Sequence, residues 1–271
     1  MIDFHAHMGT LYRDDYPQVV RLTASGLVSR MDQEGIDISV VLPLESPEGG
    51  WGWSFTEEVV HARNEYPTRI VAFCCVDPRD PKGPQLIDHF VTKHDCRGFG
   101  EHVNGLAFDD PLNKALYAKC NDHGLPLVFG DDLECFDLPG LPRLEACLKE
   151  FPDVKFCGHG PGFWSAISGD DPRTGYPTRP VTPGGALDRL LDEYENLHLD
   201  LSAGSGYNAL TRDPEFTLGF IERHWRRMLW GTDITHALAD LPQIEWIKTI
   251  DIAEDVRQAI ADGNARKLLG L

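Results

Sequence analysis

The stretch MIDFHAHMGT (residues 1–10) opens the chain with a short apolar run that ends in two histidines one residue apart. In a β-strand, successive side chains point to opposite faces, so His5 and His7 point the same way. We expect a strand over residues 2–7 in which both imidazoles face the axis of a closed sheet, while Ile2 and Phe4 face a covering layer of helices. Two such imidazoles can hold one metal ion, although the pair alone is not a specific signal.

Seven further apolar runs of strand length follow, and each is separated from the next by a stretch with helical periodicity. The expected strands are residues 2–7, 38–44, 69–77, 97–103, 126–130, 154–158, 197–202 and 227–233. The expected helices are residues 19–35, 56–65, 85–94, 112–123, 143–151, 186–195, 215–225 and 253–269. This alternation predicts an α/β fold, a single (β/α)8 TIM-type barrel spanning residues 1–271. An open doubly wound sheet is the alternative, but the turn after the first strand, HMGTLYRDDYP, contains no G-x-G-x-x-G.

Composition limits the classes of partner. The chain has 271 residues, with 25 Lys and Arg against 43 Asp and Glu, so its formal net charge is −18. Such a surface repels nucleic acid and anionic lipid, and we expect neither as a partner. No apolar stretch is long enough to span a membrane, and the first residues do not resemble a secretory leader. The 7 cysteines are irregularly spaced without C-x-x-C, which indicates reduced thiols in a cytoplasmic protein. The oligomeric state is not indicated.

Three more strand ends carry side chains of metal-binding type. Glu101 follows CRGFG, His159 follows VKFCG, and Asp233 follows MLWGT. The carboxyl ends of barrel strands surround the mouth where barrel active sites are built. Each residue alone has a simpler explanation as a helix cap, a turn residue or an ion pair. Together with His5 and His7 they predict one shared metal site, and the mixed histidine and carboxylate set fits Zn²⁺ best and Mn²⁺ second.

Two long segments without clear periodicity are expected to cover this mouth, residues 160–185 and residues 203–215. They supply the candidates for substrate contact. Arg179 and Arg212 could bind a substrate carboxylate, and Trp164 and Tyr176 could form a pocket wall. His236, three residues after the strand-eight aspartate, is a further candidate. The alternative for each is a residue that is solvated or that only anchors a loop.

The motifs DFHAH, GEHVNG, KFCGHGPG, WGTD and GNARKLLGL, in this order, resemble the amidohydrolase superfamily. The most similar branch is the amidohydrolase-related group that includes aminocarboxymuconate-semialdehyde decarboxylase. The resemblance runs from residue 2 to residue 271, and it implies a distorted (β/α)8 barrel with one or two divalent metal ions at its mouth. The residues that match the metal-binding positions of the family are His5, His7, Glu101, His159 and Asp233.

One position departs from the family pattern. Relatives commonly carry a metal-binding histidine at the end of strand five, whereas here the stretch LPLVFGDDLE (residues 125–134) has Gly130. Asp131 or Asp132 could fill in as an oxygen ligand. Otherwise one ligand is missing, which favours one ion over two. The remaining set is His5, His7, Glu101 and Asp233, with His159 as a further ligand or close neighbour.

These residues predict a metal-dependent hydrolase that attacks a small-molecule amide, lactone or ester with metal-activated water. Asp233 is the expected proton acceptor, and His159 is expected to stabilise the developing oxyanion or to share the acid–base role. The same residues suit the non-oxidative decarboxylation of a small unsaturated or aromatic carboxylic acid. A third reading is a non-catalytic relative that binds a small molecule and has lost its full metal set.

Overall fold

The computed structural model describes residues 1–11, 20–49, 52–130 and 135–271. Parallel strands form at all eight expected places, and six of them are shorter than the expected ranges, the exceptions being those near residues 126–130 and 154–158. The eight strands are β1 (Ile2–Ala6), β4 (Ile38–Val41), β6 (Ile70–Ala72), β7 (Phe99–His102), β9 (Pro126–Gly130), β11 (Lys155–His159), β12 (Leu197–Asp200) and β13 (Met228–Leu229). Most are continuous apolar runs because both faces of each strand are covered.

These strands form a TIM-type barrel, as predicted. They make two parallel sheets with the orders β1-β4-β6 and β13-β12-β11-β9-β7. Isolated parallel bridges join the sheets at both seams, Cys74 to Phe99 and Ala6 to Ile234. At the second seam the Phe4 amide also donates to the Trp230 carbonyl, over 2.9 Å. The first and last strands of the chain are therefore neighbours, and the carboxyl ends of all eight strands meet at one mouth.

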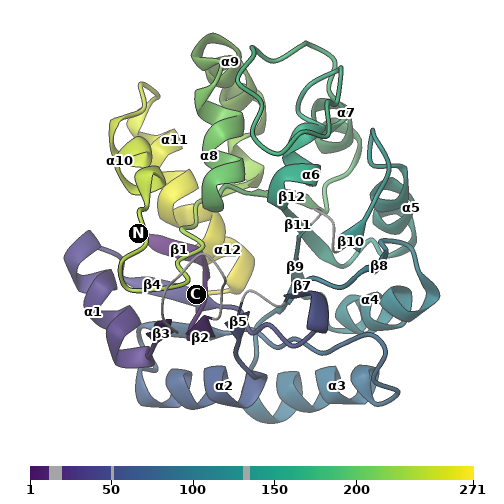
Figure 1. Cartoon of the computed structure of the whole chain (residues 1–271), viewed down its shortest axis with the longest axis vertical. Helices are drawn as coiled ribbons and strands as arrows, with labels where there is room; N and C mark the ends of the chain where they lie inside the picture. The colour runs from purple at the N-terminus through teal and green to yellow at the C-terminus, as the bar shows by residue number, and fades with distance from the viewer. Residues whose placement is uncertain (12–19, 50–51, 131–134) are drawn as a thin grey trace.

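Helices surround the strands (Figure 1). Those that match the expected positions are α1 (Ala24–Glu34), α2 (Thr56–Glu65), α3 (Gly83–His94), α4 (Pro111–His123), α5 (Pro142–Glu150), α7 (Ala186–Glu193), α9 (Pro214–His224) and, at the end of the chain, α11 (Glu254–Gln258), a π-helical segment (Ala259–Gly263) and α12 (Asn264–Leu269). Several begin at a side chain that accepts a free backbone N–H of the first turn, namely Thr23, Asp110 and Asp213.

Several elements lie outside the sequence prediction. They are α6 (Gly160–Ser165), α8 (Ala203–Thr211), α10 (Pro242–Thr249), η1 (Pro47–Gly49), η2 (Trp225–Arg227) and the short strands β2 (Gly9–Leu11), β3 (Val20–Leu22), β5 (Gly52–Trp53), β8 (Leu106–Ala107) and β10 (Cys135–Phe136). The expectation that both long mouth segments are irregular is thus wrong for residues 160–165 and for nearly all of residues 203–215, where α8 is followed by the start of α9 at Pro214. The glycines of AGSG suggest a loop, but Gly206 lets α8 approach the barrel, since a Cβ there would come within 2.5 Å of the Leu201 carbonyl oxygen.

The inside of the barrel holds its own apolar core. Its fully buried members include Ile2, Phe4, Val40, Leu42, Phe73, Val128, Cys157 and Leu229, and α12 closes one end with Ala265 and Leu269. Figure 1 shows α12 and the C-terminus near the middle of the ring of strands. The expectation that Ile2 and Phe4 face the helices is therefore wrong.

An irregularity in β1 explains this difference. The pairing of β1 with β4 shifts register between Asp3 and Ala6. Such a bulge breaks the strict alternation of faces and re-aims the side chains that follow it. As a result Phe4 lies in the inner core, Ala6 packs in the outer core, and His5 and His7 still face the mouth.

The described cysteines are all free and buried (Cys74, Cys75, Cys96, Cys120, Cys147 and Cys157). None of the helices in the described ranges is both long enough and apolar enough to cross a membrane.

Candidate metal centre

Four side chains from three parts of the barrel converge at the mouth. The Nε2 atoms of His5 and His7 lie 3.0 Å apart. The Oε2 atom of Glu101, on β7, lies 3.6 Å from His5 Nε2 and 3.3 Å from His7 Nε2. The Oδ1 atom of Asp233, which follows β13, lies 3.6 Å and 3.2 Å from the same two nitrogens.

These separations match the donor shell of a single cation. Zinc binds nitrogen and oxygen at about 2.0–2.2 Å, so neighbouring donors at tetrahedral or octahedral angles lie roughly 3.0–3.5 Å apart. The five measured separations run from 3.0 to 3.6 Å. The ligand atoms of His5, His7 and Asp233 all lie within 4.8 Å of one another, which is close enough to hold one ion. The side chains present therefore fit one divalent cation.

His159, the last residue of β11, stands slightly apart from this set. Its Nε2 lies 3.9 Å from Glu101 Oε1 and 3.9 Å from Asp233 Oδ2. Both distances exceed a hydrogen bond. Each carboxylate thus turns one oxygen towards His5 and His7 and the other towards His159. This leaves His159 facing the cluster from a second direction.

The opposite nitrogen of each imidazole has its own partner. His5 Nδ1 lies 2.6 Å from Asp200 Oδ2, and His7 Nδ1 lies 2.9 Å from the Leu42 carbonyl oxygen. A carboxylate and a carbonyl only accept, so Nδ1 carries the proton in both rings and each Nε2 keeps its lone pair for a metal. His159 Nδ1 instead lies 3.0 Å from the hydroxyl of Ser202, which can either donate or accept.

Charge compensation within the cluster shifts several pKa values. Burial disfavours the charged form of His5, but Asp200 and Glu101 outweigh it and raise the pKa of His5 well above its usual value. Burial also opposes charge on His7, yet hydrogen bonds to Asp233 and Glu101 raise its pKa to about 9. Burial alone would raise the pKa of Glu101, but the two histidines hold it well below the usual range. The metal-free cluster therefore carries protons that a cation would displace.

Asp200, at the carboxyl end of β12, was missed from the sequence. It is fully buried, and its two oxygens accept from His5 Nδ1 and, at 3.0 Å, from the Ser202 amide. Its burial would raise its pKa, but the charge of His5 lowers it instead. In the sequence Asp200 lies inside the apolar run LHLDLS (residues 197–202), and only the end of β12 at Asp200 in the structure places it at the mouth.

Gly130 makes room for Glu101. A Cβ at position 130 would lie 3.1 Å from Glu101 Oε1 and 3.2 Å from a methyl group of Val103. The space beside the carboxyl end of β9 is thus filled by the carboxylate from β7. Asp131 and Asp132, the alternative oxygen ligands, lie outside the described residues.

Two of the predicted substrate residues are engaged with the scaffold. Trp164, in α6, is 2% exposed, and its indole N–H donates to the Asp200 backbone oxygen over 3.2 Å. This contact ties α6 to the strand that orients His5. His236 is buried as well, and its Nδ1 accepts the Leu238 amide over 3.3 Å.

The other three candidates lie on the mouth segments. Arg179 is largely exposed and pairs with Asp170 over 2.5 Å. Arg212 is partly buried at the far end of α8 and donates to Asn208 over 3.3 Å. The exposed ring of Tyr176 lies over the first turn of α8. Neither arginine joins the clustered metal-binding residues, and the role of all five candidates in substrate binding stays a prediction.

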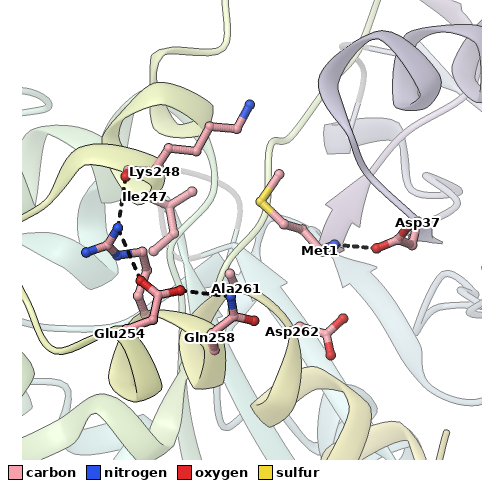
Figure 2. A pocket seen from close by; sticks show the side chains of 9 residues that line it. Met1, Asp37, Ile247, Lys248, Glu254, Gln258, Ala261 and Asp262 are labelled. Atoms are coloured by element: carbon pink, nitrogen blue, oxygen red, sulfur yellow. Dashed lines mark hydrogen bonds and ion pairs between the residues drawn. The ribbon is translucent and has the colours of Figure 1, made fainter.

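A separate hollow of about 470 Å³ lies at the other end of the barrel (Figure 2). Met1 and Asp37, which line it, directly precede β1 and β4, whereas the clustered ligands stand at the carboxyl ends of the strands. Several of its charged groups are paired, for example the Met1 ammonium with Asp37 over 2.5 Å and Arg257 with Glu254 over 3.5 Å. This hollow is therefore not part of the metal centre.

Comparison with known families places the chain. The family model described as amidohydrolase matches residues 2–271, so the chain belongs to the amidohydrolase family. No curated protein sequence matches it.

Solved structures share the fold at low sequence identity. An uncharacterised TIM-barrel protein from Bordetella bronchiseptica is 20% identical, with a TM-score of 0.68 over 90% of this chain and 81% of that one. A probable 2-pyrone-4,6-dicarboxylic acid hydrolase from Acinetobacter baumannii, with citric acid bound, is 15% identical, with a TM-score of 0.68 over 100% and 99% of the two chains. A dihydroxybenzoic acid decarboxylase from a Polaromonas species, with bound manganese and 2-nitroresorcinol, is 16% identical, with a TM-score of 0.61 over 100% and 96%. The family and these neighbours include both hydrolases and decarboxylases.

Proposed function

We propose that this chain is a metal-dependent hydrolase that cleaves an amide, lactone or ester bond in a small molecule, as a single catalytic domain. The observation that carries the proposal is that Glu101 Oε2 and Asp233 Oδ1 each lie 3.2–3.6 Å from the Nε2 atoms of both His5 and His7, which are themselves 3.0 Å apart. Both imidazoles are held with Nε2 facing the shared centre. One Zn²⁺ is the preferred ion and Mn²⁺ the second choice, since imidazole suits zinc and added carboxylates suit harder ions.

A divalent cation held by these residues would supply Lewis acidity, polarising a carbonyl and lowering the pKa of bound water towards about 7. Asp233 is the base that takes the proton of the attacking water. Its side chain is more exposed than those of His5, His7 and Glu101, and its Oδ2 points towards His159 rather than towards His5 and His7.

His159 is proposed as the acid–base partner rather than as a ligand. The Ser202 hydroxyl at its Nδ1 can donate to the neutral ring and accept from the charged ring. A proton can therefore enter or leave at Nε2 without leaving Nδ1 unpaired. His5 and His7 instead have acceptor-only partners at Nδ1, which favour the tautomer that turns the Nε2 lone pair towards a cation and so support their assignment as ligands.

Metal analysis tests the site. Protein expressed with ample zinc should contain close to one ion per chain, and the His5→Ala/His7→Ala variant should lose it. The control is His89→Ala/His94→Ala, an exposed pair on α3 whose Nε2 atoms lie 3.2 Å apart and which belongs to no larger ligand group among the described residues. Zinc retained by the first variant, or absent from the wild type, would favour the non-catalytic binding protein.

Decarboxylation of a small unsaturated or aromatic acid is the second candidate. The manganese-bound decarboxylase of the same fold favours it. Product chemistry separates the two reactions, since the hydrolase should open lactones or cleave esters and amides without releasing CO₂. Release of CO₂ from carboxylated aromatic acids, without hydrolysis of any lactone, ester or amide tested, would replace the first proposal by the second.

The buried, free cysteines support a cytoplasmic location for this enzyme. The acidic surface supports a small-molecule substrate rather than nucleic acid or a membrane.

A further inference from the structure

We propose that Asp3 is a positioning residue that fixes the distance between the β1 histidines and Asp233. The proposal rests on the metal site proposed above and adds a residue that is not a ligand. Asp3 lies on β1, two residues before His5, and is 1% exposed. Its carboxylate accepts the Thr232 amide over 2.8 Å, the Thr232 hydroxyl over 2.7 Å and the His5 amide over 3.2 Å.

Asp3 therefore holds both ligand-bearing segments with one carboxylate. On its own strand it accepts the amide of His5, where the pairing with β4 is irregular. A bulge of this kind re-aims the residues that follow it, so the bond to the His5 amide bears on where both imidazoles point. On the neighbouring segment Asp3 accepts hydrogen bonds from the amide and the hydroxyl of Thr232, the residue before Asp233.

The Asp233 turn needs such support. Its φ of 56° lies in the left-handed region, which side-chain-bearing residues adopt only when their surroundings hold them there. The Asp233 amide donates to the His5 carbonyl over 2.7 Å. The Thr232 hydroxyl also accepts the Ile234 amide over 3.1 Å, and Gln243 donates to the Thr232 carbonyl over 2.6 Å. Among the described residues, Asp3 is the only side chain of acidic or basic type with a hydrogen bond to Thr232.

Asp3 acts through others and not as a ligand. Both of its oxygens are engaged with Thr232 and the His5 amide. In the described residues, two groups have ligand atoms close enough together to hold an ion, one of His5, His7 and Asp233 and one of His5, His159 and Asp200, and neither includes Asp3. The carboxylate is thus expected to change metal binding through geometry alone.

The test compares Asp3→Ala with Asp3→Asn in the full-length protein. The readouts are the Zn²⁺ dissociation constant, measured by competition with a chelator, and the visible spectrum of the Co²⁺-loaded protein, which reports ligand geometry. Asp3→Ala should weaken zinc binding by about tenfold or more, the lower end of the range for residues that orient ligands, and should alter the cobalt bands. Asp3→Asn keeps an oxygen for the two amides and should stay within about threefold of the wild type with an unchanged spectrum.

The matched control is Asp137→Ala. Asp137 is a largely buried carboxylate that accepts the amides of Leu138, Arg143 and Leu144 at the start of α5, and it belongs to neither group of possible metal ligands in the described residues. Its removal should lower the melting temperature without changing zinc affinity or the cobalt spectrum. If Asp3→Ala does not fold, Thr232→Val removes only the hydroxyl partner and should shift both readouts in the same direction.

The outcomes separate the two proposals. A wild-type protein that binds neither zinc nor cobalt would refute the metal site itself. The other outcome is that the wild type binds both ions and that Asp3→Ala or Thr232→Val has the same zinc affinity and cobalt spectrum as Asp137→Ala. This result would support the metal site and overturn the role of Asp3.

Discussion

Replacement of Asp200 by asparagine removes one charge and almost no volume beside the metal centre. The two oxygens of Asp200 accept from His5 Nδ1 over 2.6 Å and from the Ser202 amide over 3.0 Å. An asparagine amide has one accepting oxygen and one donating nitrogen. If the asparagine oxygen faces His5, its nitrogen is a donor against the Ser202 amide. If the nitrogen faces His5, it is a donor against Nδ1–H, and His5 avoids this only by moving its proton to Nε2, where it then lacks the lone pair that faces the cation.

The size of the effect follows from this conflict. Loss of a residue that orients a metal ligand typically weakens metal affinity by about 10- to 100-fold, or about 1.4–2.7 kcal/mol. Asp200→Asn should lie near the upper end, because Asp200 is fully buried and solvent cannot replace the lost acceptor. Chelator competition near neutral pH measures the zinc dissociation constant directly.

A second carboxylate–histidine pair provides the control. Asp188 Oδ1 lies 2.7 Å from His224 Nε2 in the helix layer, so Asp188→Asn breaks a similar bond away from the mouth. It should leave zinc affinity unchanged. If Asp200→Asn bound zinc within about twofold of the wild type, the argument that Asp200 holds the ligand form of His5 would be refuted.

Three further predictions use other parts of the structure. Burial opposes charge on His7, but neighbouring carboxylates hold its pKa at about 9. Zinc binding should therefore release protons at neutral pH, and zinc affinity should rise as the pH approaches about 9. Calorimetry in buffers of different ionisation enthalpy measures this release, and zinc binding without it would contradict the prediction. Burial lowers the pKa of His102 from 6.5 to about 4, so between these pH values the unfolded chain binds more protons than the folded one. As the pH falls through this interval, the unfolding free energy of the wild type should drop by about 3 kcal/mol more than that of His102→Gln. Parallel curves of unfolding free energy against pH for the two proteins would contradict the prediction. In Gly98→Ala the new Cβ would lie 2.2 Å from the Phe73 ring, which should lower the unfolding free energy by about 1–3 kcal/mol, whereas Gly175→Ala, with nothing within 4 Å, should be neutral in the same urea titration.

The barrel was predictable because its strands are short apolar runs set between amphipathic stretches. Helix boundaries agreed to the residue for α2 and to within one residue for α4, whereas the helix expected over residues 19–35 begins only at Ala24, after β3 and the capping residue Thr23. Strand boundaries agreed less well, since the run over residues 69–77 yields only β6 (Ile70–Ala72). Apolar residues can continue past the last ladder hydrogen bond, so composition alone does not mark where pairing stops.

The bulge in β1 was not predictable from local pattern. Strict alternation puts Phe4 among the helices, yet the strand shifts register in that region, and the Asp3 carboxylate there bonds a threonine 229 positions later. Such a contact exists only after both ends of the chain have met. The same limit hid Asp200, which reads as one polar position inside the apolar run LHLDLS until His5 is placed beside it.

The candidate ligands themselves were predictable as residue types at strand ends, because the carboxyl ends of barrel strands meet at one mouth. What the sequence could not provide is their division of labour. That division depends on Nδ1 partners such as the Leu42 carbonyl and the Ser202 hydroxyl, which carry no distinctive sequence signal.

The seam between β1 and β13 has a consequence for synthesis on the ribosome. The first histidines emerge early, but the segment that pairs with them and carries Asp233 is made more than two hundred residues later. A nascent chain must therefore keep β1 unpaired on one side until translation is nearly complete, and closing so large a loop slows folding. Metal acquisition should accordingly be a late, post-translational event rather than a nucleus around which the growing polypeptide organises.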